Sequence, residues 1–164
     1  GVVVNGNILS GPNAITGEWG HNPLPWRFAD EYPGVECYCG KQGCIETFLC
    51  GSSLARILDN GLNAEEITAQ ANAGDPAATQ AIDQYANRLA RALASVINIL
   101  DPNVIVLGGG LSNIGYLYEA VPDLWQQWVF SDQADTKLVP NQHGDSSGVR
   151  GAAWLWYDDN TEQK

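Results

Sequence analysis

The chain has 164 residues, of which 45% are hydrophobic, and it carries a formal net charge of −11 at pH 7. That length suits one compact domain or one lobe of a larger protein, and the acidic balance disfavours nucleic acid and anionic membrane surfaces as partners, because both require a basic face. No apolar run approaches the length of a membrane span and no signal peptide is visible, so we expect a reduced, cytoplasmic setting.

The first predicted element is a short β-hairpin. Val2–Val4 and Ile8–Leu9 flank Asn5-Gly6, which suits a type I′ turn because both residues tolerate positive φ. The chain contains no methionine and opens directly on this apolar strand, so we expect a piece of a longer polypeptide. Residues 10–47 are punctuated by glycine and proline and predict loops, and a short helix is expected over residues 51–58.

Two further helices carry recognisable start signals. Asn63 and Glu66 form a predicted capping box, and Asp75-Pro76 begins the next helix with proline where its missing N–H costs nothing. This second helix is expected to run to Leu100 and to end at Asp101-Pro102. Its apolar residues recur at helical spacing and predict one face in the core: Ala78, Ile82, Tyr85, Leu89, Ala92, Leu93, Val96, Ile99 and Leu100.

A buried strand that leads into a glycine-rich turn follows. Val104–Leu107 is a continuous apolar run, which is typical of a strand buried on both faces, and Gly108, Gly109 and Gly110 come directly after it. Ligands of open α/β sheets bind at the carboxyl ends of strands, so we expect these glycines at the edge of a site. The remaining predicted elements are a helix over 116–129, a strand at Leu138-Val139, a helix over 148–156 and a polar tail over 158–164.

These elements together predict an α/β lobe in which helices cover a central sheet. The helix over 116–129 carries an aromatic-rich face, formed by Tyr116, Leu117, Val121, Leu124, Trp125, Trp128 and Val129. We interpret this face mainly as core, and part of it as a candidate surface for a homodimer, since aromatic residues are enriched at interfaces.

One histidine and three cysteines are spaced as a candidate metal site. His21 precedes the run Cys37-Tyr38-Cys39-Gly40-Lys41-Gln42-Gly43-Cys44, and one imidazole with three thiols is a complete tetrahedral ligand set for zinc. The two glycines let the loop turn tightly enough for Cys39 and Cys44 to converge. Two disulfides that include Cys50 are the alternative, although a Cys37–Cys39 bridge would be strained and this chain is apolar enough to build a core without bridges. Under the zinc interpretation Cys50 is a small buried hydrophobe.

Two carboxylates flank these ligands. Glu18 lies just before His21, and Glu46 lies just after Cys44. In isolation both would be ordinary surface acids, but groups that act on a ligand cluster beside metal ligands. We therefore predict that both contact a polar ligand.

Four segments of the sequence resemble the signature of the ROK family of sugar kinases and sugar-responsive repressors. They are Gly17–His21, Cys37–Glu46, Val106–Ser112 and His143–Ala153. The stretch Gly20-His21-Asn22-Pro23-Leu24-Pro25-Trp26 looks most like the bacterial fructokinase (mannokinase) branch of that family.

The resemblance implies a two-lobed, actin-like ATPase (ribonuclease H-like) fold with sugar and ATP in the cleft between the lobes. Residues 1–157 would be the C-terminal lobe, with a zinc-braced loop over about residues 17–47. By the same resemblance, the binding roles fall on three sets of residues: Glu18, His21 and Glu46 for sugar hydroxyls, His21, Cys37, Cys39 and Cys44 for structural zinc, and Gly108, Gly109 and Gly110 for the nucleotide of Mg-ATP.

The resemblance also implies that the catalytic base is absent from this sequence. In the family the base is an aspartate of the N-terminal lobe, in an Asn-Asp pair, and a first phosphate-binding motif Asp-x-Gly-Gly-Thr lies there too. Neither motif occurs here. Phosphoryl transfer requires nucleophile, metal-bound phosphate and base to be positioned together, so we expect this chain alone to be inactive.

Three functions are therefore weighed. The first is the C-terminal part of an ATP-dependent hexose kinase that phosphorylates the sugar 6-hydroxyl, with fructose favoured and N-acetylglucosamine or glucose as alternatives. The second is the sugar-sensing lobe of a repressor of the same family, and the third is a zinc-braced structural or dimerisation domain without a ligand.

Overall fold

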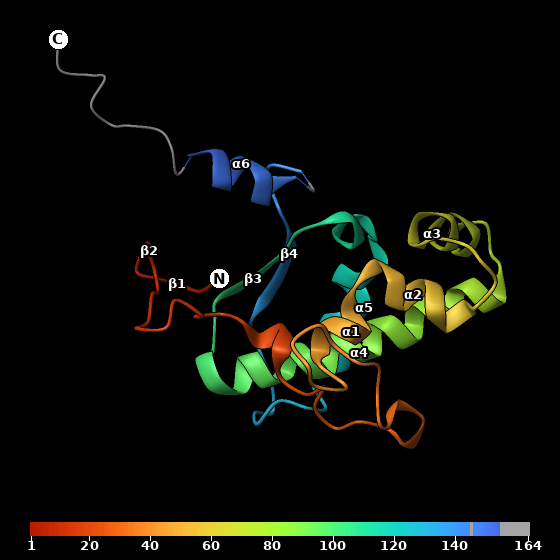
Figure 1. Ribbon diagram of the computed structural model, residues 1–164, viewed down its shortest axis with the longest axis horizontal. Coiled ribbons are helices and arrows are strands. Elements are labelled where there is room, and N and C mark those ends of the chain that lie inside the picture. The colour runs from red at the N-terminus through yellow and green to blue at the C-terminus, as the bar shows by residue number, and fades with distance from the viewer. Residues whose placement is uncertain (145, 155–164) are drawn as a thin grey trace, which may run out of the picture.

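The computed structural model describes residues 1–144 and 146–154 of the chain (Figure 1). The predicted polar tail over 158–164 and the last two residues of the predicted 148–156 helix lie outside the described residues. Within the described part, helices and two pairs of strands alternate along the chain, as the predicted α/β class requires.

The fold is organised around one long helix, α4, which spans Pro76–Leu100. Four shorter helices pack against it: α1 (Ile45–Leu49), α2 (Gly51–Leu58), α3 (Ala64–Asn72) and α5 (Tyr116–Trp125). Figure 1 shows α4 crossing the molecule with α2 and α3 at one end. The predicted 76–100 and 51–58 helices are confirmed, and the core lies between α4 and its neighbours. The burial predicted for Ile99 and Leu100 is wrong, because the last turn of α4 extends beyond the core and leaves both exposed.

Both predicted helix starts are confirmed by side-chain hydrogen bonds. Oδ1 of Asn63 accepts from the N–H groups of Glu65 and Glu66 at 2.9 and 3.0 Å, and Oε2 of Glu66 accepts from the N–H of Asn63 at 2.8 Å. Oδ1 of Asp75 accepts from the N–H of Ala78 at 2.8 Å. These bonds satisfy donors that the first helical turn leaves without a partner.

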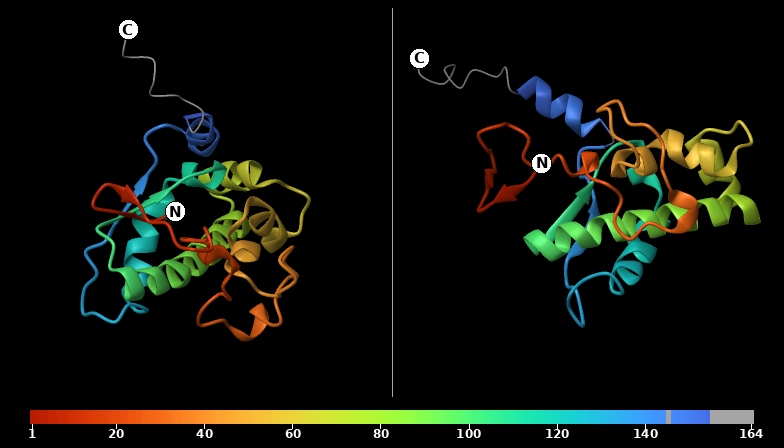
Figure 2. Two further views of the ribbon diagram at one scale, coloured as in Figure 1. Left: turned by 60° about the vertical axis from the view of Figure 1, so that its left-hand side comes forward. Right: turned by 60° about the horizontal axis from the view of Figure 1, so that its bottom comes forward.

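The predicted hairpin forms from β1 (Val3–Val4) and β2 (Asn7–Ile8), which pair antiparallel. Its turn has φ of +51° at Asn5 and +78° at Gly6, as a type I′ turn requires. The second pair is parallel and joins β3 (Val104–Leu107) to β4 (Lys137–Pro140), so the predicted strand at 138–139 is confirmed. Figures 1 and 2 show the hairpin standing apart from the β3–β4 pair.

The burial predicted for Val104–Leu107 is wrong. Ile105 and Leu107 pack against the main core, but Val104 and Val106 are 47% and 58% exposed. Alternate residues of a strand point to opposite faces, and among the described residues helices cover one face of the β3–β4 pair. In the described part of the chain, this apolar run therefore forms a strand with one face packed on the core and the other face exposed.

The aromatic-rich helix is shorter than predicted and serves the core. α5 ends at Trp125, not at residue 129, and Trp128 and Val129 lie in the turn that follows. Leu117, Val121 and Trp125 are almost fully buried against the core around α4. The last described helix, α6 (Ser147–Trp154), follows β4 and lies at the periphery (Figures 1 and 2).

The segment predicted as loops contains three short helical pieces that the sequence patterns did not reveal. They are η1 (Trp19–His21), η2 (Ala29–Glu31) and α1 (Ile45–Leu49). Each is too short to show a helical period. A search of the described helices for one both long and apolar enough to cross a bilayer finds none.

Candidate functional site

The four predicted metal ligands meet at one point. Ligand atoms of His21, Cys37, Cys39 and Cys44 all lie within 4.8 Å of one another. The Sγ of Cys37 is 3.6 Å from Nδ1 of His21, and the Sγ atoms of Cys39 and Cys44 are 3.7 Å apart. That separation far exceeds a disulfide bond of about 2.05 Å, and all four cysteines are free.

The loop that carries the cysteines is held by its own backbone. The N–H of Cys37 donates to the carbonyl of Lys41 at 2.7 Å, and the N–H of Gly40 donates to the carbonyl of Cys37 at 2.9 Å. Gly40 has a φ of +83°, which favours glycine. Gly43 has a φ of +69°, and a side chain there would collide with the guanidinium of Arg27.

The donor set and its spacing fit zinc. Tetrahedral zinc with Zn–S near 2.3 Å and Zn–N near 2.05 Å places two sulfurs about 3.8 Å apart and a sulfur and a nitrogen about 3.6 Å apart. The cluster shows 3.7 Å for Cys39 to Cys44 and 3.6 Å for Cys37 to His21. Cys50 lies outside the cluster and is partly exposed, contrary to the prediction of a buried hydrophobe, because it occupies the junction between α1 and α2.

Two of the thiols differ in their readiness to ionise. A hydrogen bond from the backbone of Lys41 lowers the pKa of the Cys39 thiol to about 7, with smaller contributions from the neighbouring cysteines. Burial, together with the neighbouring thiols of Cys39 and Cys37, raises the pKa of the Cys44 thiol to about 11. Since thiolates are the metal-binding form, Cys39 gives up its proton to a cation more readily than Cys44 does.

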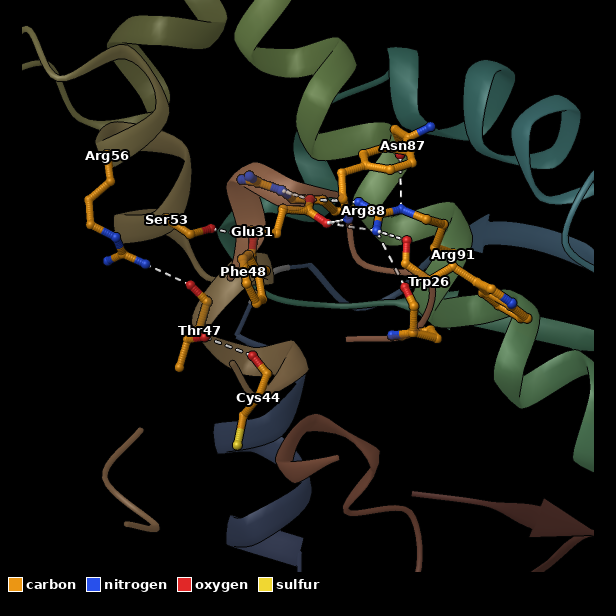
Figure 3. Close-up of polar contacts among 12 residues, drawn as sticks. Trp26, Glu31, Cys44, Thr47, Phe48, Ser53, Arg56, Asn87, Arg88 and Arg91 are labelled. Atoms are coloured by element: carbon orange, nitrogen blue, oxygen red, sulfur yellow. Dashed lines mark hydrogen bonds and ion pairs between the residues drawn. The ribbon is translucent and has the colours of Figure 1, made fainter. Parts of the chain in front are cut away.

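A second set of contacts ties the 17–47 loop to α4. Glu31 is 3% exposed, and its Oε1 accepts from Nε of Arg88 at 2.8 Å and from Nη2 of Arg91 at 2.7 Å. Oε2 accepts from Nη1 of Arg91 at 2.8 Å and from the N–H of Phe28 at 2.9 Å. Arg91 is fully buried and also donates to the carbonyl of Trp26 at 2.8 Å. Figure 3 shows Glu31 and the two arginines joined in this network.

The network fixes the charge state of Glu31. Burial alone would raise its pKa, but hydrogen bonds from Arg91, Arg88 and Phe28 outweigh burial and lower the pKa to about 2. The carboxylate is therefore charged at neutral pH and paired with two buried cations. We did not predict this network, although two arginines within the mainly apolar stretch 88–97 of α4 were a signal that an acidic partner lay elsewhere in the chain.

A third set of contacts joins the far end of the 17–47 loop to α2. The hydroxyl of Thr47 donates to the carbonyl of Cys44 at 2.8 Å, and Nη2 of Arg56 donates to the carbonyl of Thr47 at 2.6 Å (Figure 3). Ser53 donates to the carbonyl of Phe48 at 2.5 Å. These bonds hold α1, and with it Glu46, beside the metal ligands.

Two of the predicted sugar-contacting residues, His21 and Glu46, lie side by side at the cluster, and Glu18 precedes His21 by three residues. Glu18 directly precedes η1, His21 ends it, and Glu46 lies in the first turn of α1. Oε2 of Glu46 is 3.4 Å from Nε2 of His21, the ring nitrogen that faces away from Cys37. Glu18 and Glu46 are exposed and His21 is partly exposed, so a ligand from solvent can reach all three.

Tyr38 is a site residue that the sequence reasoning missed. Its hydroxyl is 2.8 Å from Nε2 of His21. The pKa of the Tyr38 hydroxyl lies above its usual value, because desolvation by neighbouring groups and the negative charges of Glu46, Cys37 and Glu18 disfavour its ionised form. Its position between two predicted metal ligands was the signal available in the sequence.

The glycine-rich turn lies beside η1, as well as beside α2. Gly108, Gly109, Gly110 and Trp19 line one cavity of about 440 Å³. A second, larger pocket of about 1020 Å³ lies between α2, α3 and the turn, and it shares Gly51, Gly110 and Leu111 with the first. Gly109 has a φ of +81°, and a Cβ on any of the three glycines would meet open space. The turn therefore leaves its backbone accessible to a ligand.

Comparison with known proteins identifies the family. The family model described as ROK family matches residues 1–159. The chain belongs to the ROK family. It is 37% identical to the N-acetyl-D-glucosamine kinase of Yersinia enterocolitica, in an alignment that covers 94% of this chain and 54% of that protein. This ROK chain thus spans about half the length of the curated relatives it matches.

Solved structures of the family share its fold. A ROK family glucokinase from Streptomyces griseus, in complex with glucose and AMPPNP, matches with a TM-score of 0.80 at 24% identity, over 93% of this chain and 55% of that one. A ROK family transcriptional regulator, a homologue of the E. coli MLC protein, matches with a TM-score of 0.75 at 28% identity, over 94% of this chain and 42% of that one. The predicted family and the predicted α/β fold class are both confirmed.

Proposed function

We propose that this chain supplies the sugar-recognition surface, a structural zinc site and part of the nucleotide site of an ATP-dependent hexose kinase. The observation that carries the proposal is the contact between Glu46 and His21 beside a four-ligand cluster, with Trp19 of the same short helix lining a cavity at the glycine-rich turn. The named relatives support it, since those reported above include two sugar kinases.

The hydrogen-bond donors and acceptors of these side chains support a sugar site. Carboxylates of Glu18 and Glu46 accept hydrogen bonds and suit the hydroxyl groups of a hexose, which donate them. Nδ1 of His21 faces the thiols, so a zinc ion bound there would leave Nε2 to carry the ring proton and donate to a sugar oxygen. Zinc would supply structure here, because four protein ligands complete its tetrahedral shell.

The turn after β3 and the pockets beside it support a nucleotide site. The open backbone at Gly108–Gly110 allows close approach of a phosphate or ribose. The pocket of about 1020 Å³ next to Gly110 has the size of a cofactor pocket. We propose Mg-ATP as its ligand, and we place no catalytic base among residues 1–164, so this chain alone should transfer no phosphate.

The choice of hexose rests on two opposed indications. The stretch Gly20–Trp26 favours fructose by its resemblance to the fructokinase branch, whereas the curated relative named above is an N-acetyl-D-glucosamine kinase. We propose N-acetylglucosamine as the first candidate and fructose as the second. Titration with N-acetylglucosamine, fructose, mannose and glucose, followed by NMR signals of His21 and Trp19, ranks them directly.

One substitution tests whether the acidic pair binds sugar. Glu18→Ala should weaken sugar binding by about tenfold or more, because it removes an acceptor of charge-assisted hydrogen bonds, and should leave the metal content of the chain unchanged. Glu36→Ala, an exposed carboxylate of the same loop, is the matched control. Equal sugar affinity in Glu18→Ala and the control would contradict the assignment.

A sugar-sensing lobe of a transcriptional regulator is the second candidate, favoured by the similarity to the ROK regulator. Both candidates require sugar binding, and only the kinase requires the nucleotide. Binding of an ATP analogue at the glycine-rich turn, seen as shifts in the amides of Gly108–Gly110, would favour the kinase. Sugar binding without any nucleotide response would favour the regulator.

We also propose that two copies of the chain associate. Several large apolar side chains are exposed near the end of α4 and the turn after α5, namely Ile99, Leu100, Val104 and Phe130. Exposed apolar groups that gather in one region are typical of interfaces. Sedimentation that reports only a monomer at high concentration would contradict this proposal.

A further inference from the structure

Tyr38 is placed by the backbone on which the cysteine ligands sit. It lies between Cys37 and Cys39, in the turn closed by the hydrogen bond from the N–H of Gly40 to the carbonyl of Cys37. Its side chain is 84% exposed, so packing does not explain its position. Single exposed aromatic residues are common on protein surfaces, and the contacts that Tyr38 makes are what set it apart.

Those contacts are all with the candidate sugar site. The Tyr38 hydroxyl is 2.8 Å from Nε2 of His21, and the two rings meet edge to face with centroids 5.0 Å apart and planes at 89°. Oε2 of Glu46 is 3.4 Å from the same nitrogen.

The Tyr38 hydroxyl occupies the position that a sugar oxygen would need. Nε2 of His21 has one hydrogen to donate, and a neutral imidazole whose other nitrogen faces the thiols donates it from this atom. The Tyr38 hydroxyl, at 2.8 Å, is closer to this nitrogen than Oε2 of Glu46, at 3.4 Å, and is therefore the better placed acceptor when Nε2 carries the proton. A sugar hydroxyl that accepts from His21 must therefore displace the hydroxyl of Tyr38.

The ring of Tyr38 offers a large apolar surface at the site. The groups of Glu18, Glu46 and His21 assigned to the sugar are polar, whereas a hexose also has C–H faces, and an N-acetyl sugar has a methyl group. An aromatic ring provides an apolar wall at a low cost in side-chain entropy. An exposed tyrosine whose backbone is fixed can turn about its side-chain bonds and lay its ring on the ligand.

We propose that Tyr38 is a sugar-contacting, specificity-determining residue. In the free protein its hydroxyl is the hydrogen-bond partner of His21, and in the complex a sugar hydroxyl takes that place while the Tyr38 ring packs on the apolar part of the sugar. The inference rests on the proposed function, because it takes the ligand of this site to be a hexose.

Two substitutions distinguish the contribution of the Tyr38 ring to sugar binding from that of the Tyr38 hydroxyl. Tyr38→Ala removes both and should weaken binding of N-acetylglucosamine by about three- to tenfold, the range expected for one aromatic contact. Tyr38→Phe keeps the ring and removes the competing hydroxyl, so binding should be unchanged or tighter by up to about threefold. Tyr116→Phe, which breaks the 2.6 Å hydrogen bond from an exposed tyrosine to Asp83, is the matched control.

Affinity is measured by NMR titration of the purified chain, with the ¹⁵N signals of the His21 ring as the reporter and metal content checked for every variant. Without sugar, Tyr38→Phe should shift the Nε2 signal because that nitrogen loses its partner. The proposal is supported if Tyr38→Ala binds sugar more weakly, Tyr38→Phe binds it at least as well as wild type, and both retain wild-type metal content.

Three outcomes overturn it, and they are distinguishable. Wild-type affinity in Tyr38→Ala would remove Tyr38 from the site while leaving the proposed function intact. Weaker binding in Tyr38→Phe would show that the hydroxyl contacts the sugar and would contradict its role as a displaced partner. No response of wild-type His21 to any of the four hexoses would overturn both this inference and the proposed sugar site.

Discussion

The 17–47 loop is held at two places by different chemistry. At one place, His21 and three cysteines gather around a point where a cation fits; at the other, Glu31 is enclosed by Arg88 and Arg91 of α4. The first brings together residues of the loop itself, and the second joins residues 57 and 60 positions apart. The histidine–cysteine cluster therefore joins parts of the loop to one another, while the ion pairs fix where the loop sits on the core.

We call the first set of contacts the metal brace (His21, Cys37, Cys39 and Cys44) and the second the ion-pair brace (Glu31, Arg88 and Arg91). The two braces also differ in whether they need a bound ion. Three thiols and an imidazole need a cation to become a strong interaction. The Glu31 network is complete without any ligand, because each charge already has a partner. Changes in one brace should therefore leave a recognisable signature that changes in the other do not.

The largest expected effect comes from breaking the metal brace. Cys39→Ser should abolish stoichiometric zinc binding and lower the free energy of unfolding by several kcal/mol, since structural zinc binding is coupled to folding. Metal analysis and denaturant unfolding measure both. Cys50→Ser, which alters a thiol outside the cluster, should retain the metal; full stability in Cys39→Ser would refute a structural role for zinc.

Breaking the ion-pair brace should cost about 3–5 kcal/mol while sparing the metal. Glu31→Gln leaves Arg91, which is fully buried, and Arg88, which is nearly so, without a counter-charge. The matched control is Glu36→Gln, an exposed change in the same loop, expected to lie within about 0.5 kcal/mol of wild type. If Glu31→Gln lost zinc as readily as Cys39→Ser, the two braces would not be independent.

Acid should act on the ion-pair brace in a defined range. The pKa of Glu31 is lowered from 4.5 to about 2, so its stabilisation is present above pH 4.5 and is lost as the pH falls towards 2. The difference corresponds to roughly 3 kcal/mol. The stability of wild type should therefore fall more steeply with acid than that of Glu31→Gln when both are measured without metal. Parallel curves for the two proteins would contradict this assignment.

The smallest effect is expected outside both braces. Asn63→Ala removes the side-chain cap of α3 and should cost about 1 kcal/mol. Because the cap bonds join Asn63 to Glu65 and Glu66, which belong to neither brace, zinc content and acid sensitivity should match those of wild type. A change in either property would show that the braces respond to general loss of stability.

The same contrast explains how far the sequence could be read. The cysteine spacing predicts a metal site because few residue types bind metals and the ligand residues lie close together in the chain. The capping signals at Asn63 and Asp75 are equally local, and both are confirmed. Gly108–Gly110 was placed correctly after a strand, although the exposed face of Val104 and Val106 was not foreseen, because burial depends on what covers a strand.

Polar contacts between residues far apart in the chain could not be predicted from such local patterns. Nothing in the sequence near Glu31 indicates that its partners lie on α4, since surface acids of similar appearance occur at Glu36 and Asp30. Tyr38 was overlooked for a related reason: an aromatic residue between two cysteines reads as a spacer until its hydroxyl is seen next to His21. The local spacing of His21 and the cysteines identifies candidate metal ligands, but only the fold shows which other side chains lie next to them.

The most direct test is metal content combined with a thiol count on the chain purified under non-reducing conditions. One zinc per chain, with three of the four thiols protected until a chelator is added, is the predicted result. Absence of metal together with absence of reactive thiols would show a disulfide protein and would contradict the zinc site, along with the role given to His21.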